Sequence, residues 1–366
     1  MEMKAAVLFD YKQPFSIETI TLDEPKAGEV RVKIKASGVC HSDYHLMTGD
    51  TQHPMPVICG HEGAGIVEAV GEGVTRVQTG DHVILNWTPS CGRCFYCIAG
   101  KPTLCETFTP PIWAGTLQDG TNRTHLNGED VYLYCGLGTH AEYVVVPQEA
   151  CIAISKDIWL KAASLVGCAV ATGVGAVLFT ADVRPGASVV VLGCGGVGLN
   201  AIQGAALAGA EKIIAVDVNH RKKSAAVEFG ATHFLISDND LTAKIQELTG
   251  GRGADFAFEA VGIPALQEKA MEVIRPGGTA VLAGLSPMGT STNLPGAILT
   301  REEKTVKGSY YGTVVPDRDF PRLLQLYKAR KLKLDELISH EYSLEQINEA
   351  YDDLINGDIT RGIIVF

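Results

Sequence analysis

The chain has 366 residues, of which 46% are hydrophobic and 20% charged, and its formal net charge is -11 at pH 7. A chain of this length is longer than a domain with a single hydrophobic core usually is, so about two domains are predicted. The acidic balance argues against binding to nucleic acid or to anionic membranes, because both need a basic surface.

The N-terminal residues 1–10 lack a basic segment followed by an apolar one, so we expect no secretory signal and a cytoplasmic protein. The most apolar window, residues 164–179, is too short to span a bilayer, so no membrane contact is expected.

Residues 1–150 are predicted to form short strands and turns. In "VRVKIKASGVC", Val30, Val32 and Ile34 alternate with charged residues, which is the pattern of a half-buried strand. Further strand-like segments bounded by glycine are "GAGIVEAVGEGV" and "GDHVILN". Few long helical periodicities occur in this region.

Four cysteines follow within fifteen positions in "CGRCFYCIAGKPTLC". Cytosolic cysteines are mostly reduced, which favours thiolates around a metal over disulfide bonds. The spacing C-x2-C-x2-C-x7-C suits one structural zinc ion held by Cys91, Cys94, Cys97 and Cys105. An iron–sulfur cluster or chance spacing are the alternatives. A nucleic-acid zinc module is disfavoured, because this loop has only Arg93 and Lys101 as basic residues.

From about residue 165 the pattern changes to alternating strands and helices. The predicted strands are 187–193, 212–217, 233–236, 254–262 and 279–284, and the predicted helices between them are 197–210, 222–231, 241–250 and 265–278. This alternation indicates a doubly wound parallel sheet. Two amphipathic helices, 319–330 and 344–356, are expected to return to complete the first domain.

The motif "GCGGVG" fits G-x-G-x-x-G and lies between a buried strand and a helix. Such a turn holds a dinucleotide pyrophosphate at the helix N-terminus. Asp217 ends the next strand, where it would bind the adenosine ribose and repel a 2'-phosphate, so NAD is expected rather than NADP. The alternative is an ordinary strand–turn–helix with a surface aspartate. The turn residues assigned to the coenzyme are Gly193, Gly195, Gly196, Val197 and Gly198.

Further metal-ligand residue types lie in "GVCHSDYHLMTGD", "CGHEGAG" and "LVGCAVATGVG", and each is unremarkable alone. Together with the cysteine loop and the glycine turn, they make the sequence resemble the zinc-dependent medium-chain alcohol dehydrogenases, in the branch with a structural-zinc loop. The resemblance covers essentially the whole chain and includes "CHSDYH", "GHEGAGIVEAVGEGV", "GTLQDGT" and "GCAVATGVGA".

This resemblance implies an α/β protein with a GroES-like, mostly-β catalytic domain (residues 1–169 and 311–366) and a Rossmann coenzyme domain (residues 170–310). It implies two zinc ions per chain. The catalytic zinc would be held by Cys40, His61 and Cys168, and the fourth position would stay open, as is known for alcohol dehydrogenases. Asp43 would orient His61.

The resemblance also implies roles for the surrounding residues. Ser42 and His45 would carry the alcohol proton toward solvent, and Glu62 would face Arg361. His41 stands where many family members have an arginine for the pyrophosphate, so NADH should dissociate faster. Lys222 would bind the ribose, unless it is simply a solvated lysine. Further coenzyme residues implied by the family pattern are Leu285 and Arg361.

The residues matched to the substrate pocket are Ser42, Trp87, Tyr134, Cys135, Leu285 and Tyr310. Three aromatic side chains would favour unbranched or aromatic primary alcohols over bulky secondary ones. For Tyr134 and Cys135 the alternative is plain loop packing.

The sequence thus predicts an NAD-dependent zinc oxidoreductase that interconverts primary alcohols and aldehydes. The alternative is a dehydrogenase for a thiol adduct of formaldehyde, although residues 106–115 lack the Arg or Lys that would anchor a glutathione carboxylate. A noncatalytic NAD-binding protein and a zinc-free quinone reductase are disfavoured by the retained ligands. The family pattern implies a homodimer or homotetramer joined through strands near 290–312.

Overall fold

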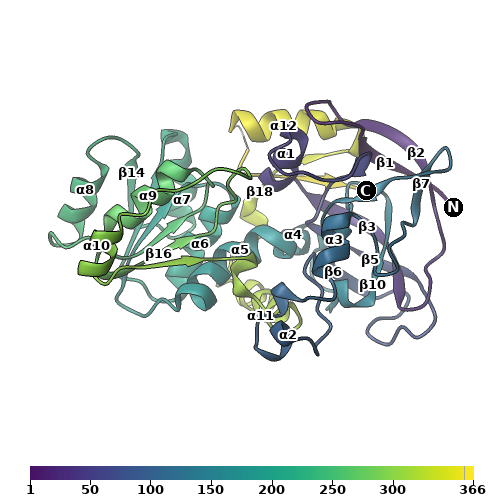
Figure 1. Cartoon of the computed structure of the whole chain (residues 1–366), viewed down its shortest axis with the longest axis horizontal. Helices are drawn as coiled ribbons and strands as arrows, with labels where there is room; N and C mark the ends of the chain where they lie inside the picture. Colours follow the sequence, from purple (N-terminus) through teal and green to yellow (C-terminus); the bar gives the residue numbers. More distant parts are fainter. Residues whose placement is uncertain (358) are drawn as a thin grey trace. The chain divides into compact units, whose positions relative to one another are not determined.

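The computed structural model describes residues 1–357 and 359–366. The chain divides into two units (Figure 1). Unit 1 contains Met1–Cys168, Val315–Arg330 and Leu334–Phe366, and unit 2 contains Ala169–Val314 and Lys331–Lys333. The predicted division, with breaks after residues 169 and 310, differs from these units by up to four residues at the breaks and in the place of Lys331–Lys333.

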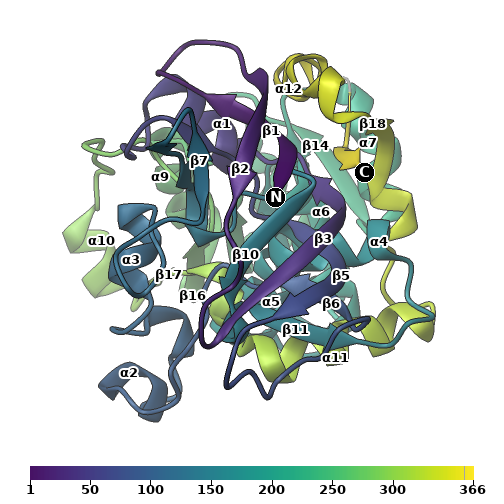
Figure 2. The same cartoon turned by 90° about the vertical axis from the view of Figure 1, so that its right-hand side faces the viewer.

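Unit 1 is built on two mixed sheets, and several of their strands, such as β1, β2, β3, β5 and β10, are labelled in Figure 2. The first sheet has the strand order β8 (Glu129–Asp130), β7 (Thr124–Leu126), β2 (Ser16–Leu22), β1 (Glu2–Leu8), β4 (Val57–Ile58) and β9 (Tyr132–Leu133). The second has the order β11 (Cys151–Ile154), β6 (His82–Leu85), β5 (Gly63–Val70), β3 (Glu29–Gly38), β19 (Arg361–Val365) and β18 (Ile338–Tyr342), with β10 (Tyr143–Pro147) paired to β3.

The predicted alternation produces the central strand β3 of the second sheet. Val30, Val32 and Ile34 are fully buried, and β3 pairs antiparallel with β5, β10 and β19. The pairing with β19 brings the end of the chain back beside the first strands. It also places the exit of β3, immediately before Cys40, in the buried interior of unit 1.

A buried polar network joins this sheet to the helix α12 (Ile347–Asn356). His140 is fully buried, and its two ring nitrogens contact Ser37 Oγ at 3.0 Å and Tyr351 Oη at 2.9 Å. Ser37 Oγ also lies 2.6 Å from Thr139 Oγ1. Burial lowers the pKa of His140 to about 4, since the charged imidazole would be desolvated.

We expect this histidine to make stability depend on pH. In the unfolded chain His140 has its ordinary pKa of about 6.5, so between about pH 6.5 and pH 4 the unfolded state binds more protons. As the pH is lowered from about 6.5 to about 4, the free energy of unfolding should fall in the wild type by up to about 3 kcal/mol more than in His140→Gln. Urea unfolding at several pH values, with zinc held constant, measures this difference. Parallel curves would contradict the expectation, and the exposed His340→Gln variant should follow the wild type.

Unit 2 is a six-stranded parallel sheet with the order β14 (His233–Ile236), β13 (Lys212–Asp217), β12 (Ser188–Leu192), β15 (Ala254–Glu259), β16 (Ile274–Leu282) and β17 (Thr305–Gly308). The strand order reverses between β12 and β15, which is the switch point of a doubly wound sheet. The predicted fold class is therefore confirmed. The largest boundary error is at the helix predicted over 265–278, which ends at Val273, because β16 begins at Ile274 and not at residue 279. Pro276 and Gly277 disfavour helix at that point.

The remaining helices connect these strands and cover the sheets. In unit 1 they are α1 (His41–Thr48), α2 (Phe95–Ile98), α3 (Thr109–Ala114), α4 (Leu160–Leu165) and α11 (Pro316–Lys328). In unit 2 they are α5 (Ala171–Gly175), α6 (Gly196–Leu207), α7 (Lys223–Glu228), α8 (Leu241–Leu248), α9 (Pro264–Val273) and α10 (Gly296–Arg301).

The most apolar window of the sequence lies inside one longer helix, Leu160–Ala181, which includes α4 and α5. At 22 residues and a mean hydropathy of 2.0 it is long and apolar enough to span a membrane, so the length argument from residues 164–179 was wrong. In the structure 89% of its apolar window is buried, as in a core helix of a globular protein. Its turns widen to π geometry at Val166–Val170, around Cys168.

Candidate metal centre and coenzyme site

Four buried side chains of unit 1 converge on one point. Cys40, His61, Glu62 and Cys168 each present a ligand atom, and these atoms lie within 4.8 Å of one another. Cys40 follows β3, His61 and Glu62 precede β5, and Cys168 comes from the widened helical turn. Wide turns of this kind often occur at functional sites. Three of the four are the residues predicted to hold the catalytic zinc.

The donor set fits a zinc ion. Asp43 is fully buried, and its carboxylate oxygens lie 3.1 and 3.2 Å from His61 Nδ1. Asp43 Oδ1 also accepts a 2.7 Å hydrogen bond from the Gly60 amide. This contact holds the proton on Nδ1 and leaves Nε2 as a metal ligand, as in other carboxylate–histidine–zinc sites. Asp43 therefore lies where an orienting residue is needed.

The groups around His61 favour positive charge at this point of unit 1. Burial lowers the pKa of His61. The Asp43 carboxylate and the two cysteine sulfurs together raise it by more, so the pKa of His61 lies well above its ordinary value. A hydrogen bond from the Cys168 thiol lowers the pKa of Cys40 well below its ordinary value. A bound zinc ion would replace these shared protons, because it is held by thiolates and a neutral imidazole.

Glu62 pairs with Arg361, as the family pattern implied. Both side chains are buried, with exposed fractions of 0% and 2%. Burial raises the pKa of Glu62 to about 7, and the Arg361 guanidinium pulls it in the opposite direction. Arg361 is thus engaged inside unit 1, and its proposed contact with the coenzyme stays a prediction.

Ser42 and His45 lie on α1, directly after Cys40. The Ser42 hydroxyl is 3.9 Å from Cys40 Sγ, so it lies beside the ligand cluster. His45 Nδ1 is 3.2 Å from Asp50 Oδ2, and Asp50 also accepts a 2.7 Å hydrogen bond from Thr48. On a helix, residues three apart share a face. Ser42 and His45, the predicted proton acceptors, therefore lie on one side of α1.

Two aromatic rings stand against His61. The rings of Trp87 and Tyr134 lie 6.4 and 5.8 Å from the imidazole, both edge-on. Tyr134 Oη donates a 3.2 Å hydrogen bond to the Ser42 carbonyl oxygen. Cys135 is buried next to it in a left-handed backbone conformation, with φ 54°. Tyr134 therefore lies beside the cluster, and its role in a substrate pocket stays a prediction.

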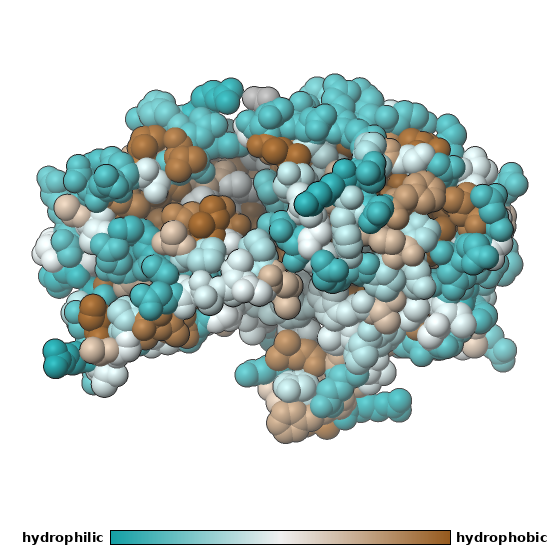
Figure 3. Space-filling view, turned by 45° about the horizontal axis from the view of Figure 1, so that its top comes forward, coloured by the Kyte–Doolittle hydropathy of each residue, from teal (hydrophilic) through white to brown (hydrophobic). Residues whose placement is uncertain are grey.

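The second cysteine cluster forms the loop that contains α2. The ligand atoms of Cys91, Cys94, Cys97 and Cys105 lie within 4.8 Å of one another, and all ten cysteines of the chain are free. This four-sulfur set fits one tetrahedral zinc ion. The loop surface is apolar in part: Phe95 and Ile98 are 71% and 76% exposed, and brown side chains appear on this projecting loop in Figure 3.

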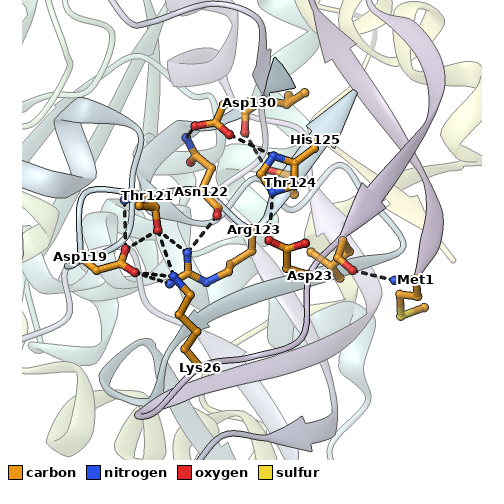
Figure 4. Close-up of polar contacts among 12 residues, drawn as sticks. Met1, Asp23, Lys26, Asp119, Thr121, Asn122, Arg123, Thr124, His125 and Asp130 are labelled. Carbon is orange, nitrogen blue, oxygen red and sulfur yellow. Dashed lines mark hydrogen bonds and ion pairs between the residues drawn. The ribbon is translucent and has the colours of Figure 1, made fainter. Parts of the chain in front are cut away.

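The segment after this loop is anchored by a buried arginine (Figure 4). Arg123 is 1% exposed and donates to Glu29 at 2.5 and 2.9 Å and to Asp119 at 2.7 Å. Its remaining contacts are with Thr121 Oγ1 and the Asn122 carbonyl. This network attaches the segment "GTLQDGTNRT" to the start of β3.

In unit 2 the glycine turn lies between β12 and α6, at the switch point of the sheet. Gly193 has φ +96°, and a Cβ there would lie 2.4 Å from Val261 Cγ2. A Cβ on Gly198 would lie 1.8 Å from the Gly193 carbonyl oxygen, so only glycine lets α6 pack this close. A Cβ on Gly195 would meet nothing within 4 Å, which leaves open space for a phosphate group. The turn fits a dinucleotide pyrophosphate.

Asp217 lies at the end of β13, beside this turn. Its carboxylate accepts hydrogen bonds from the backbone amides of Cys194 at 2.8 Å and Asn219 at 2.9 Å. A carboxylate has about four acceptor positions, so two remain for ribose hydroxyls. Lys222 follows in the next turn, and Leu285 and Tyr310, 47% and 39% exposed, also belong to unit 2. His41 is exposed at the start of α1 in unit 1.

Sequence reasoning found Asp43 but missed several polar contacts that support the site. The Tyr134–Ser42 hydrogen bond, the His140–Tyr351 contact and the Arg123–Glu29 pair join residues 92, 211 and 94 positions apart. No local pattern marks such partners. For Arg123 a weak signal exists, since an arginine in an otherwise acidic and polar turn segment invites a search for carboxylates.

Comparison with known proteins agrees with the class that the sequence resembles. The description "Alcohol dehydrogenase GroES-like domain" matches residues 26–156, and "Zinc-binding dehydrogenase" matches residues 196–329. An NDMA-dependent alcohol dehydrogenase of Amycolatopsis methanolica is 44% identical over 100% of this chain and 99% of its own length. An S-(hydroxymethyl)glutathione dehydrogenase of Saccharomyces cerevisiae is 42% identical over 98% and 95%.

Solved structures agree. The crystal structure of benzyl alcohol dehydrogenase from Acinetobacter calcoaceticus is 31% identical, with a TM-score of 0.94 over 100% of this chain and 99% of that one. The fold, the cluster around His61 and the four-cysteine cluster together define a zinc-binding medium-chain dehydrogenase. The chain belongs to the zinc-dependent alcohol dehydrogenase family.

Proposed function

We propose that this protein interconverts primary alcohols, aliphatic or aromatic, and aldehydes, with NAD as the hydride acceptor. The observation that carries the proposal is the buried set of Cys40, His61 and Cys168, with Asp43 on the far nitrogen of the imidazole. Three protein ligands leave an open position, which a structural zinc site does not need. The cysteine loop would hold the second, structural zinc ion.

The residues of unit 1 would hold the metal and move the proton. Cys40, His61 and Cys168 would hold a zinc ion, which would supply the Lewis acidity that makes an alcohol hydroxyl more acidic. The Ser42 hydroxyl then accepts the alcohol proton and passes it to His45. Because His45 Nδ1 is engaged by Asp50, the free acceptor is Nε2. Trp87 and Tyr134 exclude water around the reacting carbon and support flat or unbranched substrates.

NAD is proposed for the coenzyme from the glycine turn and Asp217. The pyrophosphate would lie at the N-terminus of α6, in the space beside Gly195. When bound, the nicotinamide supplies the hydride acceptor, so one alcohol and one NAD+ yield one aldehyde, one NADH and one proton. The similarity to an NDMA-dependent enzyme makes NDMA a second electron acceptor to be tested.

A dehydrogenase for the glutathione adduct of formaldehyde is the second candidate. The yeast relative named for this substrate favours it. Against it, residues 106–115 of this chain contain no Arg or Lys. A basic anchor for the glutathione carboxylates would have to come from another segment.

We also propose a homodimer or homotetramer in the cytoplasm. The exposed Leu294 and Ile298 and the edge strand β17 of unit 2 support an interface in residues 290–312. Ten free cysteines suit a reducing compartment. Light scattering after gel filtration measures the oligomeric state.

The test of the proposed function is NADH absorbance with zinc-loaded protein and a panel of ethanol, 1-hexanol, benzyl alcohol and 2-propanol. Parallel arms contain NDMA, or formaldehyde with glutathione. We expect turnover of the primary alcohols and about two zinc ions per chain. Turnover only with formaldehyde and glutathione would transfer the function to the adduct. Turnover only with NDMA would contradict free NAD as the acceptor.

A further inference from the structure

His53 is a buried histidine that the mechanism above does not use. It lies between α1 and β4, and only 7% of its surface is exposed. The Tyr11 hydroxyl fixes its backbone, because Tyr11 Oη accepts from the His53 amide at 2.9 Å and donates to the His53 carbonyl at 3.0 Å. The side chain therefore has a defined position.

The hydrogen bonds of the ring determine its protonation. His53 Nδ1 lies 3.0 Å from the Pro54 carbonyl oxygen, which can only accept, so Nδ1 carries the proton. Burial lowers the pKa of His53, so the ring is neutral at physiological pH. Nε2 therefore presents a lone pair and acts as an acceptor. Within residues 1–357 and 359–366, this buried atom has no hydrogen-bond partner.

The ring stands close to the candidate metal centre. Its centroid is 5.7 Å from that of Tyr134, whose ring is 5.8 Å from His61 and 6.5 Å from Trp113. Tyr134 cannot satisfy Nε2 as a donor, since its hydroxyl is used by the Ser42 carbonyl. The lack of a side chain at Gly115 allows the His53 ring to lie here, because a Cβ at that position would be 2.7 Å from His53 Cε1.

A buried polar atom without a partner usually awaits a ligand or a water. We propose that His53 Nε2 determines specificity by accepting a hydrogen bond from a second hydroxyl group of the substrate. The substrate class is then an aromatic primary alcohol with a ring hydroxyl distant from the reacting carbon. This inference rests on the proposed function and narrows it from primary alcohols in general.

The test compares substrates of equal shape. We expect the zinc-loaded wild type to turn over 3- or 4-hydroxybenzyl alcohol with a kcat/KM about tenfold higher than the corresponding methylbenzyl alcohol, mainly through KM. The methyl group has the size of a hydroxyl but donates no hydrogen bond. A wild-type ratio near one for both ring positions would overturn the inference while leaving the proposed function standing. No turnover of any alcohol would overturn both.

Two variants identify the acceptor. His53→Phe keeps a planar ring and removes Nε2, so the hydroxyl-to-methyl ratio should collapse to about one while zinc content and benzyl alcohol turnover persist. His53→Gln can place an amide oxygen near the Nε2 position and should recover part of the ratio. The matched exchange His340→Phe, at an exposed histidine, should leave the ratio unchanged. A full ratio in His53→Phe would overturn the inference, because the preference for the hydroxyl group would then not come from Nε2.

Discussion

Replacing Cys168 with alanine should lower alcohol turnover by about 10³-fold or more and remove one of the two zinc ions per chain. Cys168 is one of three buried protein ligands in the candidate catalytic centre. Without its sulfur, the metal would keep only Cys40 and His61 of these three ligands. Metal analysis and NADH absorbance on the same preparation measure both effects.

Two further variants make the result specific. Cys94→Ala should also remove one zinc ion, but from the loop that contains α2, and it should affect stability before chemistry. Cys151 is buried in β11 outside both clusters, so Cys151→Ala should keep two zinc ions and full activity. If Cys168→Ala retained two zinc ions and wild-type turnover, the assignment of the catalytic centre would be wrong.

The strands of unit 2 could be predicted closely from the sequence. Parallel strands buried on both faces form unbroken apolar runs, and the predicted segments 212–217 and 233–236 coincide with β13 and β14. The glycine turn could be placed for a related reason. Its geometry tolerates no Cβ at Gly198, so the residue type itself reports the backbone.

Other elements gave no usable pattern. The helix Leu160–Ala181 is apolar on all sides because it is buried on all sides, so it has no polar face to reveal its period. The buried residues of helix α1 are the charged Asp43 and the apolar Leu46, so its sequence shows no amphipathic pattern that would predict a helix. Here the contact of Asp43 with His61, and not amphipathicity, accounts for the burial of the charged residue.

The ligand residues were found through family resemblance, because Cys40, His61 and Cys168 are too far apart in sequence for spacing to link them. Several supporting groups were not found. His53, His140 and Arg123 act through partners that only the folded chain brings close. Their hydrogen-bonding capacity is visible in the sequence, but what satisfies it is not.

Arg123→Met should destabilise the protein by about 3–5 kcal/mol, because it leaves the Glu29 and Asp119 carboxylates without their buried cation. Burial raises the pKa of Asp119, but hydrogen bonds from Lys26, Thr121 and Arg123 lower it more, so it stays ionised in the native protein. Urea unfolding at pH 7 measures the loss. Arg123→Lys should cost less, since a single ammonium keeps the charge but not the bidentate contact.

The double variant Arg123→Met/Glu29→Gln separates the buried charge from the buried volume. If most of the cost is the uncompensated Glu29 carboxylate, its neutralisation should restore a large part of the lost stability. Arg184→Met provides the matched control, because Arg184 pairs with Asp182 at the surface with side chains 76% and 61% exposed, and should cost less than about 0.5 kcal/mol. Equal losses for Arg123→Met and Arg184→Met would show that the buried network does not hold the segment after the cysteine loop.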